Sequence, residues 1–96
     1  MLRHCVMFRW NDDATDEAKA AIAAGLDKLA QMDVVGEYRH GPDAGMSDGN
    51  WDYAIVGDFA SVDDYQTYAT DEGHLTFIAD LIRPNISARA GVQYEV

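Results

Sequence analysis

Tyr68 and His74 are the residues of this chain whose types best suit the movement of a proton. They stand six residues apart in the segment "YATDEGH". On an unbroken helix they would point about 240° apart, since each residue turns a helix by about 100°. Gly73 lies between them, and glycine is common where a helix ends. The segment therefore predicts a break at Gly73 that turns both side chains toward one place.

Such a break would give each polar residue a chemical role. His74 at the start of a new helix would be held neutral by the positive end of the helix dipole, as a general base requires. The Tyr68 hydroxyl would donate to a developing oxyanion. His4, on a strand face with apolar neighbours, would be a third catalytic or positioning group. Aromatic and aliphatic residues are expected to bind substrate in the same pocket: Trp10, Tyr53, Phe59, Phe77 and Ile78.

Each of the three polar residues also has a purely structural interpretation. His74 could be a surface residue at a helix start, and Tyr68 could be a core tyrosine with its hydroxyl at the edge. His4 could be a hydrogen-bonded histidine on a half-buried strand. Spacing alone leaves both interpretations open.

The sequence predicts neither a cofactor nor a metal ion. It has no glycine-rich loop of the nucleotide-binding type, and residues 41–50 lack the closing glutamate of a calcium loop. Cys5 follows His4 directly, and neighbours on a strand point to opposite faces, so these two cannot act as nucleophile and base. His40 has no partner at metal-ligand spacing.

Hydrophobic spacing indicates the elements that must position these residues. Alternation predicts strands, whereas an apolar stripe at three- and four-residue steps, preceded by Thr15 as a cap, predicts the first helix. Gly25 in that helix is expected where the helix lies close to a sheet. The expected strands cover 2–10, 34–40, 51–59 and 87–96, and the expected helices cover 16–32, 62–70 and 74–83.

This order, βαββαβ, predicts an α+β fold of the ferredoxin-like type, with a four-stranded antiparallel sheet in a single domain over 1–96. Helices can cover only one face of the sheet, yet the strands carry apolar residues on both. A second copy of the chain is the simplest cover, and two sheets packed face to face would form a dimeric α/β barrel. The space between sheet and helices is the expected pocket for a small molecule.

Charge and composition narrow the possible partners. The 96 residues carry a formal net charge of −10, and the seven basic residues are scattered, which argues against nucleic acid and against an anionic membrane surface. No apolar run approaches the roughly 20 residues of a membrane span. A single cysteine and a start without a cleavage site are typical of a cytoplasmic protein.

Several short motifs follow one another in a specific order and spacing. They are "RHCVMFRW" with its His4, Gly41 after the second strand, "WDYAIVGDF", "SVDDYQTYATDEGH", "LIRP" and "VQYEV". In these motifs, over nearly its whole length, the chain resembles the stress-responsive dimeric α/β-barrel (Dabb) domain family. The resemblance implies a ferredoxin-like homodimer that forms a barrel.

The resemblance also implies roles for single residues. A plant polyketide cyclase of this fold uses a tyrosine and a histidine, which carry over onto Tyr68 and His74, and its strand histidine carries over onto His4. Residues 71–72 are Asp-Glu where the family often has His-Pro. Tyr53 lies near the place of a further pocket histidine of the cyclase. With these departures, the resemblance implies the pocket of the cyclase but not its substrate.

The sequence thus predicts a homodimer with a pocket for a small apolar carbonyl or aromatic compound. The expected chemistry is cofactor-free proton transfer of the cyclase, aldol or isomerase kind. One alternative is a non-catalytic stress or assembly protein in which the dimer is the functional unit. Another is a heme- or oxygen-dependent enzyme of a related barrel family, which would need a histidine facing a wide cavity.

Overall fold

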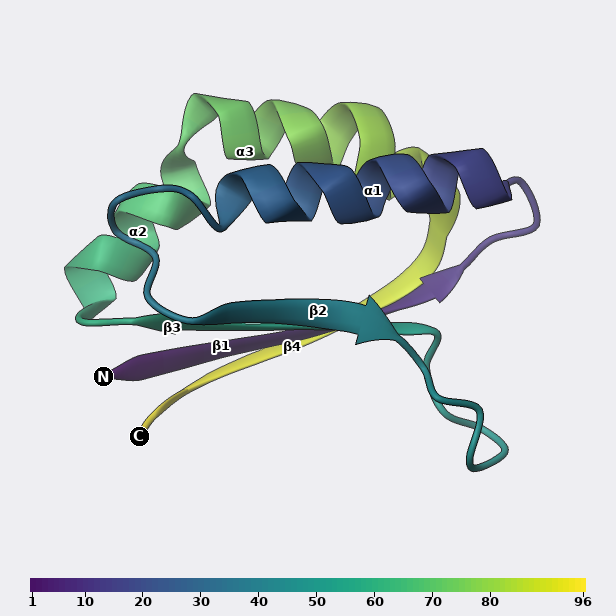
Figure 1. The fold of residues 1–96 in the computed structure, drawn as a ribbon, viewed down its shortest axis with the longest axis horizontal. Coiled ribbons are helices and arrows are strands. Elements are labelled where there is room, and N and C mark those ends of the chain that lie inside the picture. Colours follow the sequence, from purple (N-terminus) through teal and green to yellow (C-terminus); the bar gives the residue numbers. More distant parts are fainter.

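Two layers form the protein, a twisted sheet and a set of helices that covers one of its faces (Figure 1). The computed structural model describes all 96 residues, Met1–Val96. The strands are β1 (Leu2–Trp10), β2 (Tyr38–Pro42), β3 (Tyr53–Phe59) and β4 (Ile86–Glu95), and the α-helices are α1 (Asp16–Leu29), α2 (Val62–Thr70) and α3 (Glu72–Phe77). None of these helices is long and apolar enough to cross a membrane.

The sheet has the strand order β2-β3-β1-β4, and every neighbouring pair is antiparallel. The predicted ferredoxin-like fold is therefore confirmed. β1 lies in the middle, and its register places His4 opposite Gly57 of β3 and Gln93 of β4. Side chains alternate along a strand, so the even-numbered residues of β1 face the helices, where Phe8 is only 2% exposed.

The core lies between the two layers. Thr15 caps α1 by accepting a hydrogen bond from the amide of Ala18, as predicted. The buried residues of this helix pack into the core. Two of them, Ile22 and Leu26, are with Phe59 of β3 the largest fully buried side chains of the protein. The same core supplies most of the wall of the cavity described below.

Two element boundaries differ from the sequence prediction. The second strand begins at Tyr38 and not at residue 34, because the preceding segment leaves the sheet edge. Only its last residues bond to β3: the Gly36 amide donates to the Asp58 carbonyl at 2.8 Å, and the Asp58 amide donates to the Glu37 carbonyl at 2.7 Å. Its apolar residues therefore pack on the core without pairing as a strand. The first helix likewise ends at Leu29, three residues before the predicted end.

The last helical region is more irregular than predicted. The α-helix begins at Glu72 and ends at Phe77, after which the chain continues as a π-helical turn at Ile78–Ile82 and a 3-10 turn at Arg83–Asn85. Pro84 lies in that final turn, where its missing N–H and fixed φ prevent the helix from continuing regularly. The π turn presents Ile78 and Ile82 to the interior.

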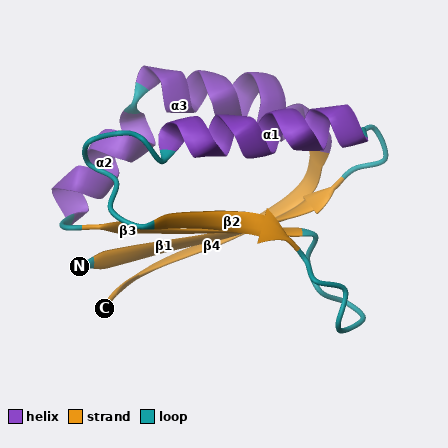
Figure 2. Cartoon of the chain, in the orientation of Figure 1, coloured by secondary structure: helices purple, strands orange, loops and turns teal.

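The prediction for Gly25 is wrong in its partner. A Cβ atom added at Gly25 would overlap with the ring of Phe77, so the close approach is between α1 and α3 and not between α1 and the sheet. Figure 2 shows these two helices side by side above the strands. Gly25 therefore fixes the depth at which Phe77 enters the interior.

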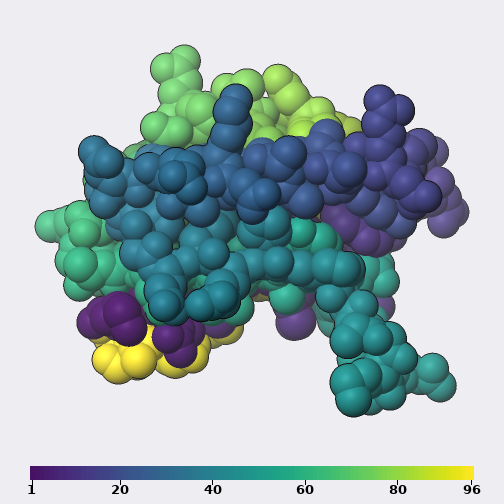
Figure 3. Space-filling model, in the orientation of Figure 1, coloured from purple at the N-terminus to yellow at the C-terminus, as the bar shows by residue number.

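The other face of the sheet carries no helix (Figure 2). It exposes large apolar side chains, among them Met7 at 42%, Val56 at 38% and Val92 at 57%. The same face holds a bidentate ion pair in which Arg3 Nε and Nη2 lie 2.7 and 2.9 Å from the Asp58 carboxylate. The loop between β2 and β3 projects from one end of the sheet, as the space-filling view in Figure 3 shows.

Candidate active site

The break between Tyr68 and His74 lies at Asp71 and not at Gly73. Asp71 has extended backbone angles, φ −58° and ψ 132°, and separates α2 from α3. Its carboxylate accepts a hydrogen bond from the amide of His74 at 3.0 Å and so caps the new helix. Gly73 lies inside α3 and does not have a positive φ. The sequence prediction named the wrong residue, because Asp71 alone is both the C-cap of α2 and the N-cap of α3.

This break brings Tyr68 and His74 together. Their ring centroids are 4.3 Å apart, with the planes inclined by 34°. The Nδ1 atom of His74 lies 3.3 Å from the carbonyl oxygen of Ala69, which can only accept, so Nδ1 carries the hydrogen. The Nε2 atom is then the unprotonated nitrogen, and it takes part in no hydrogen bond within the protein. His74 therefore offers a free lone pair beside the tyrosine ring.

His4 is held in the opposite tautomer. The side-chain amide nitrogen of Gln93 donates to His4 Nδ1 at 2.8 Å, so the hydrogen of a neutral His4 lies on Nε2. His4 is only 5% exposed, and its imidazole packs beside two tyrosine rings, with centroid distances of 5.0 Å to Tyr65 and 6.1 Å to Tyr68. His4 can therefore donate a hydrogen bond where His74 can accept one.

Burial keeps both imidazoles neutral. It lowers the pKa of His4 to about 4, with a smaller contribution from the positive charge of Arg89. Burial also lowers the pKa of His74, although the Ala69 carbonyl and the charge of Asp71 act against this shift. The sequence predicts a neutral His74 from the helix dipole, but the largest cause of its lowered pKa is removal from water.

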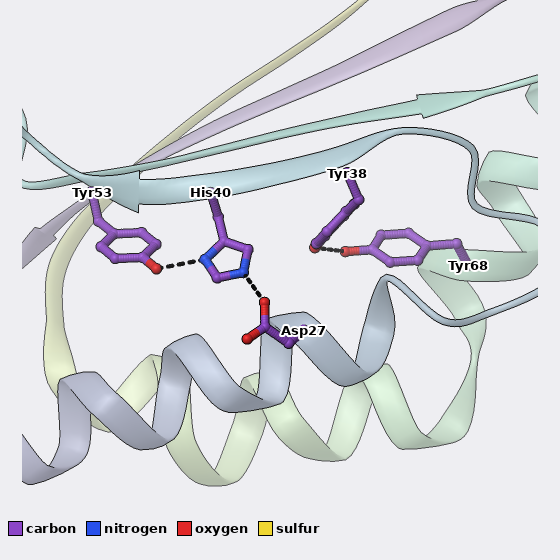
Figure 4. A network of polar contacts seen from close by, with 5 residues as sticks. All are labelled: Asp27, Tyr38, His40, Tyr53 and Tyr68. Atoms are coloured by element: carbon purple, nitrogen blue, oxygen red, sulfur yellow. Dashed lines mark hydrogen bonds and ion pairs between the residues drawn. The ribbon is translucent and has the colours of Figure 1, made fainter.

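The Tyr68 hydroxyl has a partner that the sequence did not indicate. It lies 2.7 Å from the hydroxyl of Tyr38, which comes from β2 (Figure 4). Burial raises the pKa of Tyr68, and the bond to Tyr38 lowers it in part. With Tyr38 as the donor, the hydroxyl hydrogen of Tyr68 stays free for a ligand. Nothing in the local sequence distinguishes Tyr38 from other strand tyrosines.

A cavity of about 140 Å³ lies between the sheet and the helices, and His4, Tyr68 and His74 all line it. Most of its wall is apolar, and Phe77 and Ile78, both predicted to bind substrate, belong to that wall. The cavity thus combines three polar groups at one place with a largely apolar interior, which is the usual composition of a small-molecule site.

Three residues predicted to bind substrate lie elsewhere. Phe59 is fully buried beneath the rings of Tyr65 and Tyr68, at centroid distances of 5.4 and 5.0 Å. Trp10 lies at the end of β1, with its ring 5.6 Å from that of Tyr53. None of the three predicted aromatic residues, Trp10, Tyr53 and Phe59, is part of the cavity wall. Phe59 instead packs against the cavity tyrosines, and Trp10 and Tyr53 pack against each other.

Tyr53 belongs to a second polar cluster, which also contains His40 and Asp27 (Figure 4). His40 Nε2 lies 2.6 Å from a carboxylate oxygen of Asp27, and His40 Nδ1 lies 2.6 Å from the Tyr53 hydroxyl. A carboxylate only accepts, so Nε2–H donates to Asp27 and a neutral His40 accepts from Tyr53. Sequence spacing gave no sign of this cluster, which ties β2 and β3 to α1.

Charged residues on the cavity wall were also missed. Arg83 and Arg89 both line the cavity, and no aspartate or glutamate does. Along the sequence the basic residues are scattered, and nothing in their spacing predicts that these two meet at one cavity. Nowhere in the chain do three or more His, Cys, Asp or Glu side chains lie close enough together to hold a metal ion.

The fold and the cavity define a ferredoxin-like α+β protein with a small polar–apolar site beneath its helices. The family described as "Stress responsive A/B Barrel Domain" (Dabb) matches residues 2–96, and the chain belongs to this family. The predicted family resemblance is therefore confirmed. No protein of the curated set matches the chain.

Similar solved structures agree with this assignment. A dimeric ferredoxin-like protein of unknown function from Thermobifida fusca is 32% identical, with a TM-score of 0.91 over 99% of this chain and 90% of that one. A Dabb family protein from Mesorhizobium loti is 18% identical, with a TM-score of 0.84 over 99% and 95% of the two chains. A hydroxynitrile lyase from Passiflora edulis is 20% identical, with a TM-score of 0.87 over 99% and 92%.

Proposed function

We propose that the protein is a homodimer whose cavity binds a small apolar carbonyl or aromatic compound and catalyses a cofactor-free proton transfer of the cyclase, aldol or isomerase kind. The observation that carries this proposal is the joint lining of one cavity by His4, Tyr68 and His74. Dimers are supported by the solved relatives, since the similar protein from Thermobifida fusca is described as dimeric.

The two histidines support different steps of the reaction. His74 Nε2 has a free lone pair and takes the proton from the carbon next to a carbonyl group, while the electron pair of that C–H bond moves to the carbonyl oxygen. The Tyr68 hydroxyl and His4 Nε2–H donate to the oxyanion as its charge develops. The imidazolium then returns its proton to the product carbon or oxygen, which restores the neutral base.

The volume of the cavity supports a small ligand. An apolar cavity of roughly 150 Å³ in another protein is known to hold benzene, and the present one measures about 140 Å³. An aromatic ring or a short branched chain therefore fits the inner part, with the reacting carbonyl at the polar residues. One protein of this fold, from Passiflora edulis, is described as a hydroxynitrile lyase, so the fold accommodates a lyase.

Deuterium exchange tests the proposed chemistry directly. Acetophenone in D₂O would lose its methyl hydrogens to solvent faster with the protein than in buffer, as proton NMR would show. His74→Gln is expected to slow this exchange by about 10²–10⁴-fold, the usual contribution of a general base. His40→Gln is the matched control, because His40 does not line the cavity, and it should exchange like the wild type. A wild-type rate equal to that of buffer would exclude the catalytic part.

The alternative function is a non-catalytic stress or assembly protein in which the dimer is the functional unit. The apolar side chains on the helix-free face of the sheet favour it, since patches of this kind commonly mark interfaces. Val56→Glu in this face is expected to give monomers in sedimentation experiments. Val62→Glu, at a position 48% exposed on α2, is the control and should remain dimeric. Dimers without any exchange of acetophenone would favour this function over the enzyme.

A further inference from the structure

The charged side chains of the cavity wall are all basic, whereas acidic residues predominate in the chain as a whole. The chain has 17 acidic and seven basic residues, yet the 15 residues that line the cavity include Arg83 and Arg89 and not one carboxylate. A protein with a net charge of −10 repels anions in general. An attraction for anions at this cavity would therefore have to come from these local cations.

Arg89 takes part in no ion pair, in contrast to Arg3 and Arg39. Arg3 forms two hydrogen bonds with Asp58, and Arg39 lies 3.9 Å from a carboxylate oxygen of Glu37. None of the four ion pairs in the structure includes Arg89. Its guanidinium group is thus free to bind a group that enters from solvent.

The backbone directs Arg89 toward the polar end of the cavity. Arg89 pairs with Phe8 in the β1–β4 register and so points to the helix-facing side of the sheet. Its guanidinium folds back over Gly91, where an added Cβ would lie 3.0 Å from Nη1 and 3.1 Å from Nη2. Gly91 is two residues from Gln93, which holds His4, and two strand residues span about 7 Å. The cation and the His4 imidazole therefore lie within the length of one small molecule.

We propose that the ligand of this cavity is a small apolar oxo acid, whose carboxylate pairs with Arg89 while its carbonyl faces Tyr68 and His74. This inference rests on the proposed function and specifies its substrate class. The planar guanidinium matches a carboxylate with two parallel hydrogen bonds, which a neutral ketone or alcohol cannot reproduce. Gly91 takes part by leaving room for the guanidinium above the sheet.

A matched pair of probes tests the inference. Benzoylformate carries a phenyl ring, a ketone and a carboxylate, and it has no hydrogen next to the ketone that His74 could remove. Benzoylformamide has the same shape without the charge. Titration calorimetry at pH 7 is expected to show the acid binding at least about tenfold more tightly than the amide, as a charge-assisted hydrogen bond predicts.

Variants assign the preference to one residue. Arg89→Gln should make the acid and the amide bind alike, and it should fold normally because Arg89 is exposed on an edge strand. Arg39→Gln removes the same charge from β2, away from the cavity, and should keep the preference. Gly91→Ala should reduce it severalfold by displacing the guanidinium, since the glycine has no positive φ that would forbid alanine.

The outcomes separate this inference from the proposed function. Equal binding of acid and amide to the wild type would overturn the acid preference and leave the cavity proposal standing. A preference that survives in Arg89→Gln would overturn the assignment to Arg89. Binding of neither probe at millimolar concentration would overturn the oxo-acid inference, while the exchange of acetophenone would still decide the proposed function.

Discussion

Two tyrosine–histidine pairs beneath the helices, Tyr53 with His40 and Tyr68 with His74, differ in which ring nitrogens remain free of hydrogen bonds. At His40, both ring nitrogens are engaged at 2.6 Å, one by Tyr53 and the other by Asp27. At His74, Nδ1 is engaged by a backbone carbonyl, and Nε2 has no partner in the protein. Only the pair with the free nitrogen lines the cavity. In both pairs a tyrosine lies close to a histidine. Only the pair of Tyr68 and His74 has a ring nitrogen that is free to bond a ligand in the cavity.

The two pairs also differ in how the chain builds them. His40, Tyr53 and Asp27 come from β2, β3 and α1, so their contacts hold the layers together. Tyr68 and His74 lie on consecutive helices that meet at Asp71, which ends one and caps the other. A joint between layers tolerates no unsatisfied polar group, whereas the rim of a cavity can leave one for a ligand.

The largest expected contrast concerns the two tyrosine hydroxyls in catalysis. Tyr68→Phe should slow acetophenone exchange by about 10²–10³-fold, the usual cost of removing one oxyanion donor. Tyr53→Phe should change this rate by less than about twofold, since Tyr53 does not line the cavity. Exchange rates measured by NMR for both variants would contradict the comparison if Tyr53→Phe proved the slower one.

The contrast should reverse when stability is measured. Tyr53→Phe leaves the buried Nδ1 of His40 without its partner and should lower the free energy of unfolding by about 1–3 kcal/mol. Urea denaturation would measure this loss. A double-mutant cycle with His40→Ala should show coupling between the two residues, because they share one hydrogen bond. Additive effects would mean that the bond contributes little.

The cavity histidines should make stability depend on pH. Folding lowers the pKa of His4 from 6.5 to about 4, so between these values the unfolded chain holds a proton that the folded chain does not. Stability should therefore fall as the pH decreases from 6.5 toward 4, by about 1 kcal/mol per pH unit. His4→Gln should flatten this slope in urea denaturation at several pH values, and an unchanged slope would assign the loss to other groups.

The smallest effect is expected at the exposed end of the second cluster. The Asp27 side chain is 74% exposed, whereas that of His40 is 11% exposed. Asp27→Asn should lower the free energy of unfolding by less than about 1 kcal/mol, as is usual for a solvent-exposed ion pair. Thermal unfolding beside Tyr53→Phe would show which end of the cluster matters more, and a larger loss for Asp27→Asn would contradict the ranking.

The sequence predicted the fold because the fold depends on local patterns. The alternation of β1 and the cap at Thr15 are visible in neighbouring residues, and both are present in the structure. The convergence of Tyr68 and His74 was predicted as well, although the break was placed two residues late. Glycine is the familiar helix breaker, but an aspartate that caps the next helix can end the previous one too.

The rest of the site depends on contacts between residues far apart in the chain. Tyr38 meets Tyr68 across 30 positions, and that contact follows from the strand register rather than from any motif. Arg89 reaches the cavity because β4 pairs with β1 in one particular register. A one-residue slip would turn Arg89 to the other face of the sheet. Such positions become visible only when the pairing of strands is known.

The break at Asp71 makes the meeting of Tyr68 and His74 a question of chain length. One residue inserted between Asp71 and His74 would turn the imidazole by about 100° away from the tyrosine. The same insertion in the loop between β2 and β3 would leave the pair untouched, since that loop projects from the far end of the sheet (Figure 1). The spacing counted from the capping aspartate, rather than the identity of Glu72 or Gly73, is thus what a transplanted copy of this segment would have to preserve.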